Sequence, residues 1–224
     1  MAGDPWGELR AAAAALELAL PSTFEGQART YLDVLARWER IGRLTGYTTA
    51  SHRVRHLLIE SLMLLRAVPG PGTPLLDIGS GPGVPGLIVK LARPSWEVTL
   101  LEASRRRVNF LRDVSRQLGL TGVNVCEGRA ETLGTGELAE RFATATMRAV
   151  SRVENAGALA RPFLQAEGVL VQALGRTPTP GWGSVQEVTV SLRGELPWGR
   201  RFLIIRRAEL EGDVSRGTRR DSRA

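Results

Sequence analysis

Apolar residues recur every three or four positions through the first third of the chain, which is the spacing of one face of an α-helix. The clearest example lies between residues 23 and 44, where Leu32, Trp38 and Ile41 fall on one face and Thr23 is a suitable N-cap. The periodicity predicts an all-helical N-terminal part. Its three expected helices span residues 5–20, 23–44 and 51–66.

A different pattern begins after the Pro-Gly-Pro-Gly turn of residues 69–72. Short apolar runs of strand length then alternate with segments of helical periodicity, which predicts right-handed crossovers and a parallel sheet. The last two runs have no helix between them and predict an antiparallel edge. The expected strands are 75–78, 97–101, 123–126, 143–147, 169–173, 186–192 and 202–206, and the expected helices are 85–92, 104–118 and 153–164.

The expected fold class is α/β, with a Rossmann-like, seven-stranded, mostly parallel sheet flanked by helices. This combination is the layout of class I methyltransferases. We expect a helical extension over residues 1–68 that packs on the core, and a cofactor-binding domain over residues 73–210. Residues 211–224 are polar and rich in arginine, and they predict a disordered basic tail.

The charge balance is strongly basic, with 30 basic residues against 23 acidic ones and a formal net charge of +7. Lys90 is the single lysine, so nearly all of the positive charge is carried by arginine. Arginine pairs with phosphate in a bidentate manner, which favours a polyanionic partner. The codon usage of a GC-rich genome would produce the same composition. The positions of the arginines must therefore decide between codon usage and a polyanionic partner.

The sequence also bears on location. No apolar run approaches the roughly 20 residues that a membrane span needs. Residues 1–5 lack the basic-then-apolar pattern of a signal peptide. Cys126 is the single cysteine, which excludes an internal disulfide and suits a reducing compartment. We expect a cytoplasmic monomer that makes no contact with membranes.

The most informative segment is residues 75–86, Leu-Leu-Asp-Ile-Gly-Ser-Gly-Pro-Gly-Val-Pro-Gly. An apolar strand ends in an acid, and a glycine-rich turn then leads into a helix. Glycine has no Cβ, so the backbone can approach a ligand closely, and this arrangement is typical of a nucleotide-type cofactor site. The spacing Gly81-x-Gly83-x-x-Gly86 also fits the dinucleotide pattern, which is weak evidence alone.

Asp77 discriminates between the two classes of cofactor. A carboxylate at the strand end would crowd a pyrophosphate, but it would suit the ammonium group of S-adenosylmethionine. Pro82 and Pro85 also remove amide donors that a pyrophosphate would need. We therefore favour S-adenosylmethionine over a nicotinamide dinucleotide, with Gly81 and Gly83 in the loop that approaches it.

Two further positions follow the ends of the next strands. Glu102 ends the second strand, where a carboxylate can accept hydrogen bonds from ribose hydroxyls; the alternative is a carboxylate that stabilises the start of a helix near Ser104. Ala130 and Glu131 follow the third strand, where this architecture borders the adenine. The alternative for Glu131 is a solvated loop residue.

These residues resemble a known family, the bacterial small-subunit ribosomal RNA guanine-N7 methyltransferases (RsmG, formerly GidB). The resemblance covers roughly residues 28–208, and the Pro-Gly that follows the glycine loop is its most specific part. Other matching segments are Trp38, Leu44-Thr45, Arg55-His56, Arg93-Pro94, Val98 to Ser104, Arg106 to Arg112, Leu118 to Leu120 and Arg148-Ala149.

The resemblance implies methyl transfer from S-adenosylmethionine to N7 of a guanine in the decoding-region loop of 16S rRNA. The partner would be this rRNA or the small ribosomal subunit. Implied cofactor contacts, beside Asp77, Gly81 and Gly83, are Gly79, Val84, Glu102 with its neighbours Ala103 and Ser104, Ala130, Glu131 and Arg148.

The chain departs from the family pattern in its third helix. The family has His-apolar-apolar-Asp-Ser-Leu, whereas here the segment from His56 to Leu62 is one residue longer and has Glu60 in place of Asp. One residue is about 100° on a helix, so we expect the facing of His56 relative to Glu60 to change. Further departures are Arg43 for asparagine, Met147 for serine, and Arg176 as the stand-in for a missing lysine.

Guanine N7 carries a lone pair and no proton, so the reaction needs no general base and we expect neither an acid–base pair nor a metal. Arg148 is expected to shape the methionine end of the site or to orient the guanine; the alternative is a surface ion pair at a strand end. The residues expected to contact RNA are Arg43, Arg55, His56, Arg105, Arg106 and Arg176.

Three other functions stay open at this point. A diverged class I methyltransferase could act on another RNA, a protein or a small molecule. A nicotinamide oxidoreductase is opposed by Asp77. A non-enzymatic RNA-binding protein with a decayed pocket is opposed by the presence of both acids, Asp77 and Glu102.

Overall fold

One seven-stranded sheet organises the computed structural model, which describes residues 4–148, 153–174, 186–192 and 199–211. The strands are β1 (Leu75–Ile78), β2 (Val98–Glu102), β3 (Val123–Glu127), β4 (Phe142–Arg148), β5 (Leu164–Ala173), β6 (Gln186–Ser191) and β7 (Gly199–Arg206). Their order is β3-β2-β1-β4-β5-β7-β6. Neighbours from β3 to β5 are parallel, and β7 is antiparallel to both β5 and β6. The predicted sheet and its antiparallel edge are confirmed.

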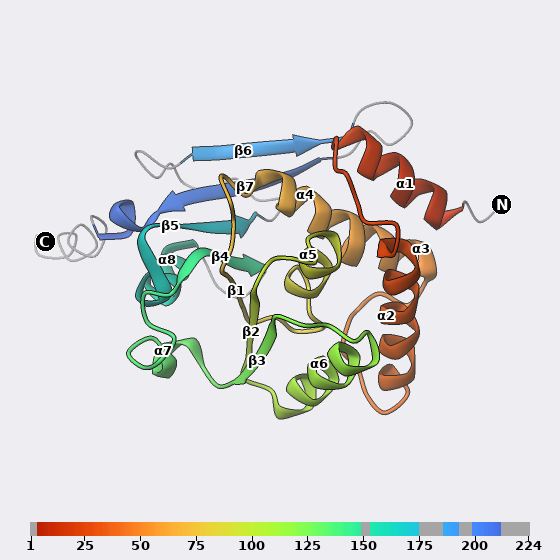
Figure 1. Ribbon diagram of the computed structural model, residues 1–224, viewed down its shortest axis with the longest axis horizontal. Coiled ribbons are helices and arrows are strands. Elements are labelled where there is room, and N and C mark those ends of the chain that lie inside the picture. Colours follow the sequence, from red (N-terminus) through yellow and green to blue (C-terminus); the bar gives the residue numbers. More distant parts are fainter. Residues whose placement is uncertain (1–3, 149–152, 175–185, 193–198, 212–224) are drawn as a thin grey trace, which may run out of the picture.

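Helices cover both faces of this sheet (Figure 1). Helices α4, α5 and α6 lie on one face with α1 and α2 outside them, and α7 and α8 lie on the other. Their bounds are α1 (Pro5–Ala15), α2 (Phe24–Glu39), α4 (Glu60–Ala67), α5 (Gly86–Ala92), α6 (Arg105–Gln117), α7 (Ala130–Leu133) and α8 (Val153–Ala160).

Two hydrophobic cores follow from the alternation of side chains along the strands. Leu75 and Leu100 belong to the core beneath the N-terminal helices, whereas their neighbours Leu76 and Leu101 belong to the core beneath α8. Burial on both faces explains why the central strands are continuous apolar runs rather than alternating ones.

The N-terminal helices share the first of these cores with the sheet. Tyr31 of α2 is fully buried, and its hydroxyl donates a hydrogen bond to the carbonyl oxygen of Pro82 in the glycine loop, 2.8 Å away. Trp38 of α2 donates its indole N–H to Asp113 of α6 over 2.9 Å. The extension therefore supports the glycine loop directly. Its treatment as a separate domain stays a prediction.

The helix expected over residues 51–66 consists of three segments: α3 (Ala50–Arg53), a π-helix η1 (Val54–Ile59) and α4. A π-turn holds one residue more than an α-turn, and here it coincides with the segment that is one residue longer than the family pattern. Across this turn His56 Nδ1 lies 2.7 Å from Glu60 Oε1. The extra residue therefore does not separate the two side chains.

Helix ends were predicted less well than the helices themselves. The second helix ends at Glu39, and Ile41, expected on its buried face, is 80 % exposed. The helix expected over 153–164 ends at Ala160, and a 3₁₀ turn, η2 (Arg161–Phe163), precedes β5. Pro162 lacks the N–H that a longer helix would need. A second 3₁₀ segment, η3 (Arg207–Glu211), follows β7.

Two predicted features fall outside the described residues, namely Arg176 and the basic tail from residue 212 onward. Within the described part of the chain, no helix is both long and apolar enough to cross a membrane. The same residues contain no group of histidine, cysteine, aspartate and glutamate side chains that could hold a metal ion.

Candidate functional site

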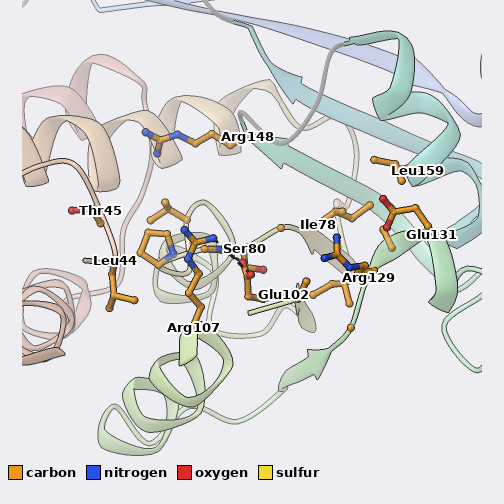
Figure 2. Close-up of a pocket in the computed structure, with 18 of the residues that line it drawn as sticks. Leu44, Thr45, Ile78, Ser80, Glu102, Arg107, Arg129, Glu131, Arg148 and Leu159 are labelled. Atoms are coloured by element: carbon orange, nitrogen blue, oxygen red, sulfur yellow. Dashed lines mark hydrogen bonds and ion pairs between the residues drawn. The ribbon is translucent and has the colours of Figure 1, made fainter. Parts of the chain in front are cut away.

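A cavity of about 860 Å³ lies at the carboxyl ends of the parallel strands, the edge at which open α/β sheets bind their ligands. Its volume is in the range of small-molecule sites, about 300–1,000 Å³. Thr45 and Arg148 lie at one end of the cavity, and Arg129, Glu131 and Leu159 lie at the other (Figure 2). Glu102 lies between the two ends.

The glycine loop lines the cavity through Gly79, Gly81 and Val84. Both glycines have left-handed backbone conformations, with φ of 70° and 56°, which residues with a side chain rarely adopt. Gly83 does not line the cavity. A Cβ at Gly83 would lie 2.4 Å from Leu87 Cδ1, so this glycine is required for packing beneath the loop rather than for ligand contact.

Asp77 takes a different position from the one predicted. Its carboxylate is buried and is absent from the cavity lining. Oδ2 accepts a hydrogen bond from the backbone N–H of Gly86 over 3.0 Å, and Oδ1 accepts one from the hydroxyl of Thr146 over 2.9 Å. The expectation that Asp77 binds the ammonium of the cofactor is therefore corrected: it ties the end of the glycine loop to β4.

Burial raises the pKa of the Asp77 carboxyl to about 6, because desolvation disfavours the charged form. Hydrogen bonds from Gly86, Thr146 and Ser80, and the charge of Arg148, act in the opposite direction. The loop is thus held by a carboxyl that carries a cost of burial when ionised.

Glu102 lines the cavity together with Ala103 and is held on both oxygens. Oε2 accepts from the backbone N–H of Gly81 over 2.8 Å, and Oε1 accepts from that of Ser104 over 2.9 Å. The Arg107 guanidinium lies 3.7 Å from Oε1. The carboxylate thus joins the glycine loop to the start of α6, and each oxygen retains a lone pair for a ligand. Ser104 itself does not line the cavity.

The far end of the cavity contains Ala130 and Glu131, as the position after the third strand predicted. It also contains Arg129 before α7 and Leu159 of α8 (Figure 2). Asn155 of α8 lines the cavity as well. Leu159 had no signal in the sequence, because an apolar helix position has the same pattern whether it faces a core or a cavity.

Arg148 ends β4 and lines the cavity with a side chain that is 20 % exposed. Its Nη2 lies 3.0 Å from Oε2 of Glu60, a residue of α4 that is only 9 % exposed. The other oxygen of Glu60 pairs with Arg200 and with His56. Arg148 therefore faces the cavity and also makes an ion pair at the strand end, and that pair is largely buried rather than on the surface. Its role toward the cofactor or the guanine stays a prediction. Glu60 was noted only as a departure from the family pattern.

The loop before α3 was also missed. Leu44, Thr45, Gly46 and Tyr47 all line the cavity. Glu39 anchors this loop, because its Oε1 accepts hydrogen bonds from both the backbone N–H and the hydroxyl of Thr45, at 3.0 and 2.7 Å. Such a loop has no periodicity, and only its tertiary contacts give it a defined conformation.

Comparison with known proteins identifies the chain. A family model described as rRNA small subunit methyltransferase G (GidB) matches residues 25–193. The chain belongs to this family. The Ribosomal RNA small subunit methyltransferase G of Chloroflexus aggregans is 38 % identical over 172 residues, which cover 76 % of this chain and 72 % of that protein. The protein of the same name from Xylella fastidiosa strain M23 is 35 % identical over 182 residues, covering 78 % and 82 %.

Solved structures agree with the fold. The crystal structure of MtNAS in complex with MTA and tNA has a TM-score of 0.54 at 15 % identity, covering 80 % of this chain and 70 % of that one. The putative methyltransferase yhhF from Escherichia coli has a TM-score of 0.51 at 20 % identity, covering 73 % and 92 %. At these identities the likeness supports the fold alone.

Membership in the rRNA small subunit methyltransferase G family confirms the resemblance predicted from the sequence. The protein is an enzyme, an S-adenosylmethionine-dependent methyltransferase that modifies a guanine of 16S rRNA. The oxidoreductase, the decayed RNA-binding protein and the diverged methyltransferase are not favoured.

Those residues predicted to contact RNA that the structure describes lie outside the cavity lining. Arg55 pairs with Glu8 of α1, and His56 pairs with Glu60. Arg105 is exposed at the start of α6. Arg43 is also exposed, and its Nε donates to the carbonyl oxygen of Thr45 over 3.2 Å.

Arg106 also has a packing role. Its guanidinium lies against the backbone of Gly42, where a Cβ would come within 2.2 Å of Nη1. Two of its buried nitrogens, Nε and Nη2, have no hydrogen-bond partner among the described residues. Arg43, Arg55, Arg105 and Arg106 are thus absent from the cavity lining, whereas Arg107, Arg129 and Arg148 belong to it.

Proposed function

We propose that the cavity at the strand ends binds S-adenosylmethionine and presents its methyl group to N7 of a guanine in 16S rRNA. The observation that carries this proposal is the position of Glu102, fixed between the glycine loop and α6 in the middle of the cavity wall. Its free lone pairs are acceptors for the two ribose hydroxyls. This position leaves one cavity end for adenine and the other for the reacting groups.

The residues divide between the two ends. Ala130, Glu131 and Leu159 would surround the adenine, and the backbone of Gly79 and Gly81 would lie against the methionine part. Asp77 acts indirectly by holding the loop. These assignments fit the residues present, because side-chain-free backbone and one fixed carboxylate meet within a single cavity.

The chemistry requires positioning rather than proton transfer. S-adenosylmethionine, when bound, supplies an electrophilic methyl group on a sulfonium sulfur. Guanine N7 attacks with its lone pair and releases no proton, so no side chain serves as a base. The chain's contribution is to align the base and exclude water, effects that can supply about 7–11 kcal/mol of the barrier. Arg148, which pairs with Glu60, would orient the guanine.

We further propose that the enzyme acts as a monomer in the cytoplasm, on 16S rRNA either free or within the small ribosomal subunit. The net charge of +7 supports a polyanionic partner. Exposed arginines outside the cavity lining, Arg43 and Arg105 among them, support the same conclusion.

The test is the product of the reaction. The purified enzyme is incubated with methyl-labelled S-adenosylmethionine and either free 16S rRNA or small subunits, and the digested nucleosides are separated by mass spectrometry. We expect the label in 7-methylguanosine from one of the two substrates. Label in another nucleoside, or in ribosomal protein alone, would contradict the proposal.

A further inference from the structure

Tyr47 gives the cavity an aromatic wall that the proposed function has not used. The residue lines the cavity, and its ring stacks on the ring of His56 with 4.5 Å between centroids and 16° between planes. Leu44 and Thr45 of the same loop lie at the Arg148 end of the cavity (Figure 2). His56 covers one face of the Tyr47 ring, so a base that stacks on this ring must use the opposite face.

A continuous set of contacts connects Tyr47 with Arg148. The His56 ring, stacked on Tyr47, places Nδ1 2.7 Å from Oε1 of Glu60. Oε2 of the same carboxylate lies 3.0 Å from Arg148 Nη2. Two cavity residues about 100 positions apart in the chain are thus joined through one buried carboxylate.

The backbone of Tyr47 is also fixed. Its N–H donates to the hydroxyl of Thr45 over 3.2 Å, and its carbonyl oxygen accepts from Arg53 Nε over 2.9 Å. Arg53 pairs in turn with Glu39, the residue that anchors Thr45. A residue whose backbone is held in this way, and whose ring is stacked on His56, loses little conformational freedom when a ligand binds, which favours affinity.

We propose that Tyr47 is the stacking platform for the target base, with Arg148 as the donor to its edge, and that His56 and Glu60 are positioning residues that fix the spacing of the two. The proposal rests on the proposed function. An unpaired RNA base is recognised by stacking on an aromatic face and by hydrogen bonds to its edge, and guanine O6 is an acceptor that a guanidinium can satisfy. The subsite therefore takes a planar purine from single-stranded RNA.

The experiment compares three variants in steady-state methylation of the active rRNA substrate. Tyr47→Ala removes the ring, Tyr47→Phe keeps it without the hydroxyl, and Thr48→Ala is the matched control, an exposed neighbour outside the cavity lining. Base–aromatic stacking predicts that Tyr47→Ala raises KM for rRNA roughly 5- to 150-fold. Tyr47→Phe should recover most of this loss, and Kd for S-adenosylmethionine should change less than about twofold.

His56 is tested through a double variant. If His56 acts by holding Tyr47, His56→Ala raises KM for rRNA, but adding it to Tyr47→Ala produces no further increase. A purely structural role of His56 would give additive effects.

Three results would overturn the proposal. These are an unchanged KM for rRNA in Tyr47→Ala, an equal rise of this KM in Thr48→Ala, or a parallel loss of S-adenosylmethionine affinity in Tyr47→Ala. A wild-type enzyme that binds S-adenosylmethionine but methylates no guanine would instead defeat the proposed function, and it is measured first.

Discussion

At the scale of single residues, Arg148 is the side chain on which the proposed reaction depends most. It lines the cavity, and Glu60 holds its guanidinium in one orientation. We predict that Arg148→Ala lowers the single-turnover rate of methylation about 100-fold, the usual consequence of losing substrate alignment. The fold should persist, because Glu60 keeps Arg200 and His56 as partners.

The matched control for this prediction is Arg207→Ala. Arg207 is similarly buried and pairs with Glu140, and it does not line the cavity. Rapid-quench kinetics measure the single-turnover rate of both variants, and thermal melts measure their stability separately. A wild-type rate in Arg148→Ala would refute the role, as would an equal loss of rate in the control.

Asp77 gives a prediction about pH. Its pKa in the folded protein is about 6, above the ordinary value of 3.8. The folded state therefore binds this proton more tightly than the unfolded state does, so the contribution of Asp77 to stability falls as pH rises from about 4 to about 6. Asp77→Asn keeps an acceptor for Gly86 and has no charge to bury.

We compare the free energy of unfolding of Asp77→Asn with that of the wild type at two pH values. Between about pH 4 and about pH 7.5, this difference should shift in favour of the variant by up to about 3 kcal/mol. Urea unfolding of the ligand-free proteins at both pH values measures this change. If the difference in free energy of unfolding between variant and wild type is the same at both pH values, Asp77 does not titrate in this range.

At the scale of elements, the start of α5 depends on glycine for packing. A Cβ at Gly86 would lie 2.4 Å from Leu100 and 2.9 Å from Asp77. We predict that Gly86→Ala destabilises the protein by about 1–3 kcal/mol through overpacking. Gly26, exposed in α2 with no atom within 4 Å of its added Cβ, is the matched control.

Gly26→Ala should instead gain about 0.5–1 kcal/mol, because alanine is the better helix former. Urea unfolding with a common m-value compares the two variants. Equal changes in the free energy of unfolding of the two variants would show that the contacts around Gly86 relax. This result would contradict the packing role given to this glycine.

The elements also explain what could be predicted from the sequence. The strands and helices could be predicted from local periodicity. The glycine loop could be predicted from its glycines, because glycine is required where the backbone must approach a ligand closely. The cavity positions of Glu102 and Glu131 followed from their places after strands. These signals are local, so a single sequence contains them.

The rest depends on contacts between distant segments. Asp77 was assigned to the cofactor because nothing in the sequence indicates its bonds to Gly86 and Thr146. The role of Glu60 depends on Arg148 and Arg200, which lie far along the chain. Helix ends were misplaced where an apolar residue such as Ile41 continued the pattern into solvent.

At the scale of the whole molecule, the excess of arginine predicts how RNA binding responds to salt. Arg105 and Arg112 are exposed on α6, and neither pairs with an acidic side chain among the described residues. Arg116 on the same helix already pairs with Asp113 over 2.6 Å. Affinity for rRNA should therefore fall steeply with salt, through counterion release.

We expect the slope of log affinity against log salt to decrease by about one for each of Arg105→Gln and Arg112→Gln. Arg116→Gln, whose charge is already compensated, should change the slope less. Filter binding across a salt series measures this. A flat salt dependence in the wild type would exclude a phosphate-contacting surface.

The central claim is that the cavity at the strand ends is the S-adenosylmethionine site, with Glu102 as its ribose acceptor. Calorimetric titration of S-adenosylmethionine into the wild type and into Glu102→Ala tests it most directly. We predict saturable one-to-one binding to the wild type and an affinity about 10- to 150-fold lower in the variant, the effect of losing hydrogen bonds to a charged group. An undiminished affinity in Glu102→Ala would contradict the account, as would binding of a nicotinamide dinucleotide in place of S-adenosylmethionine.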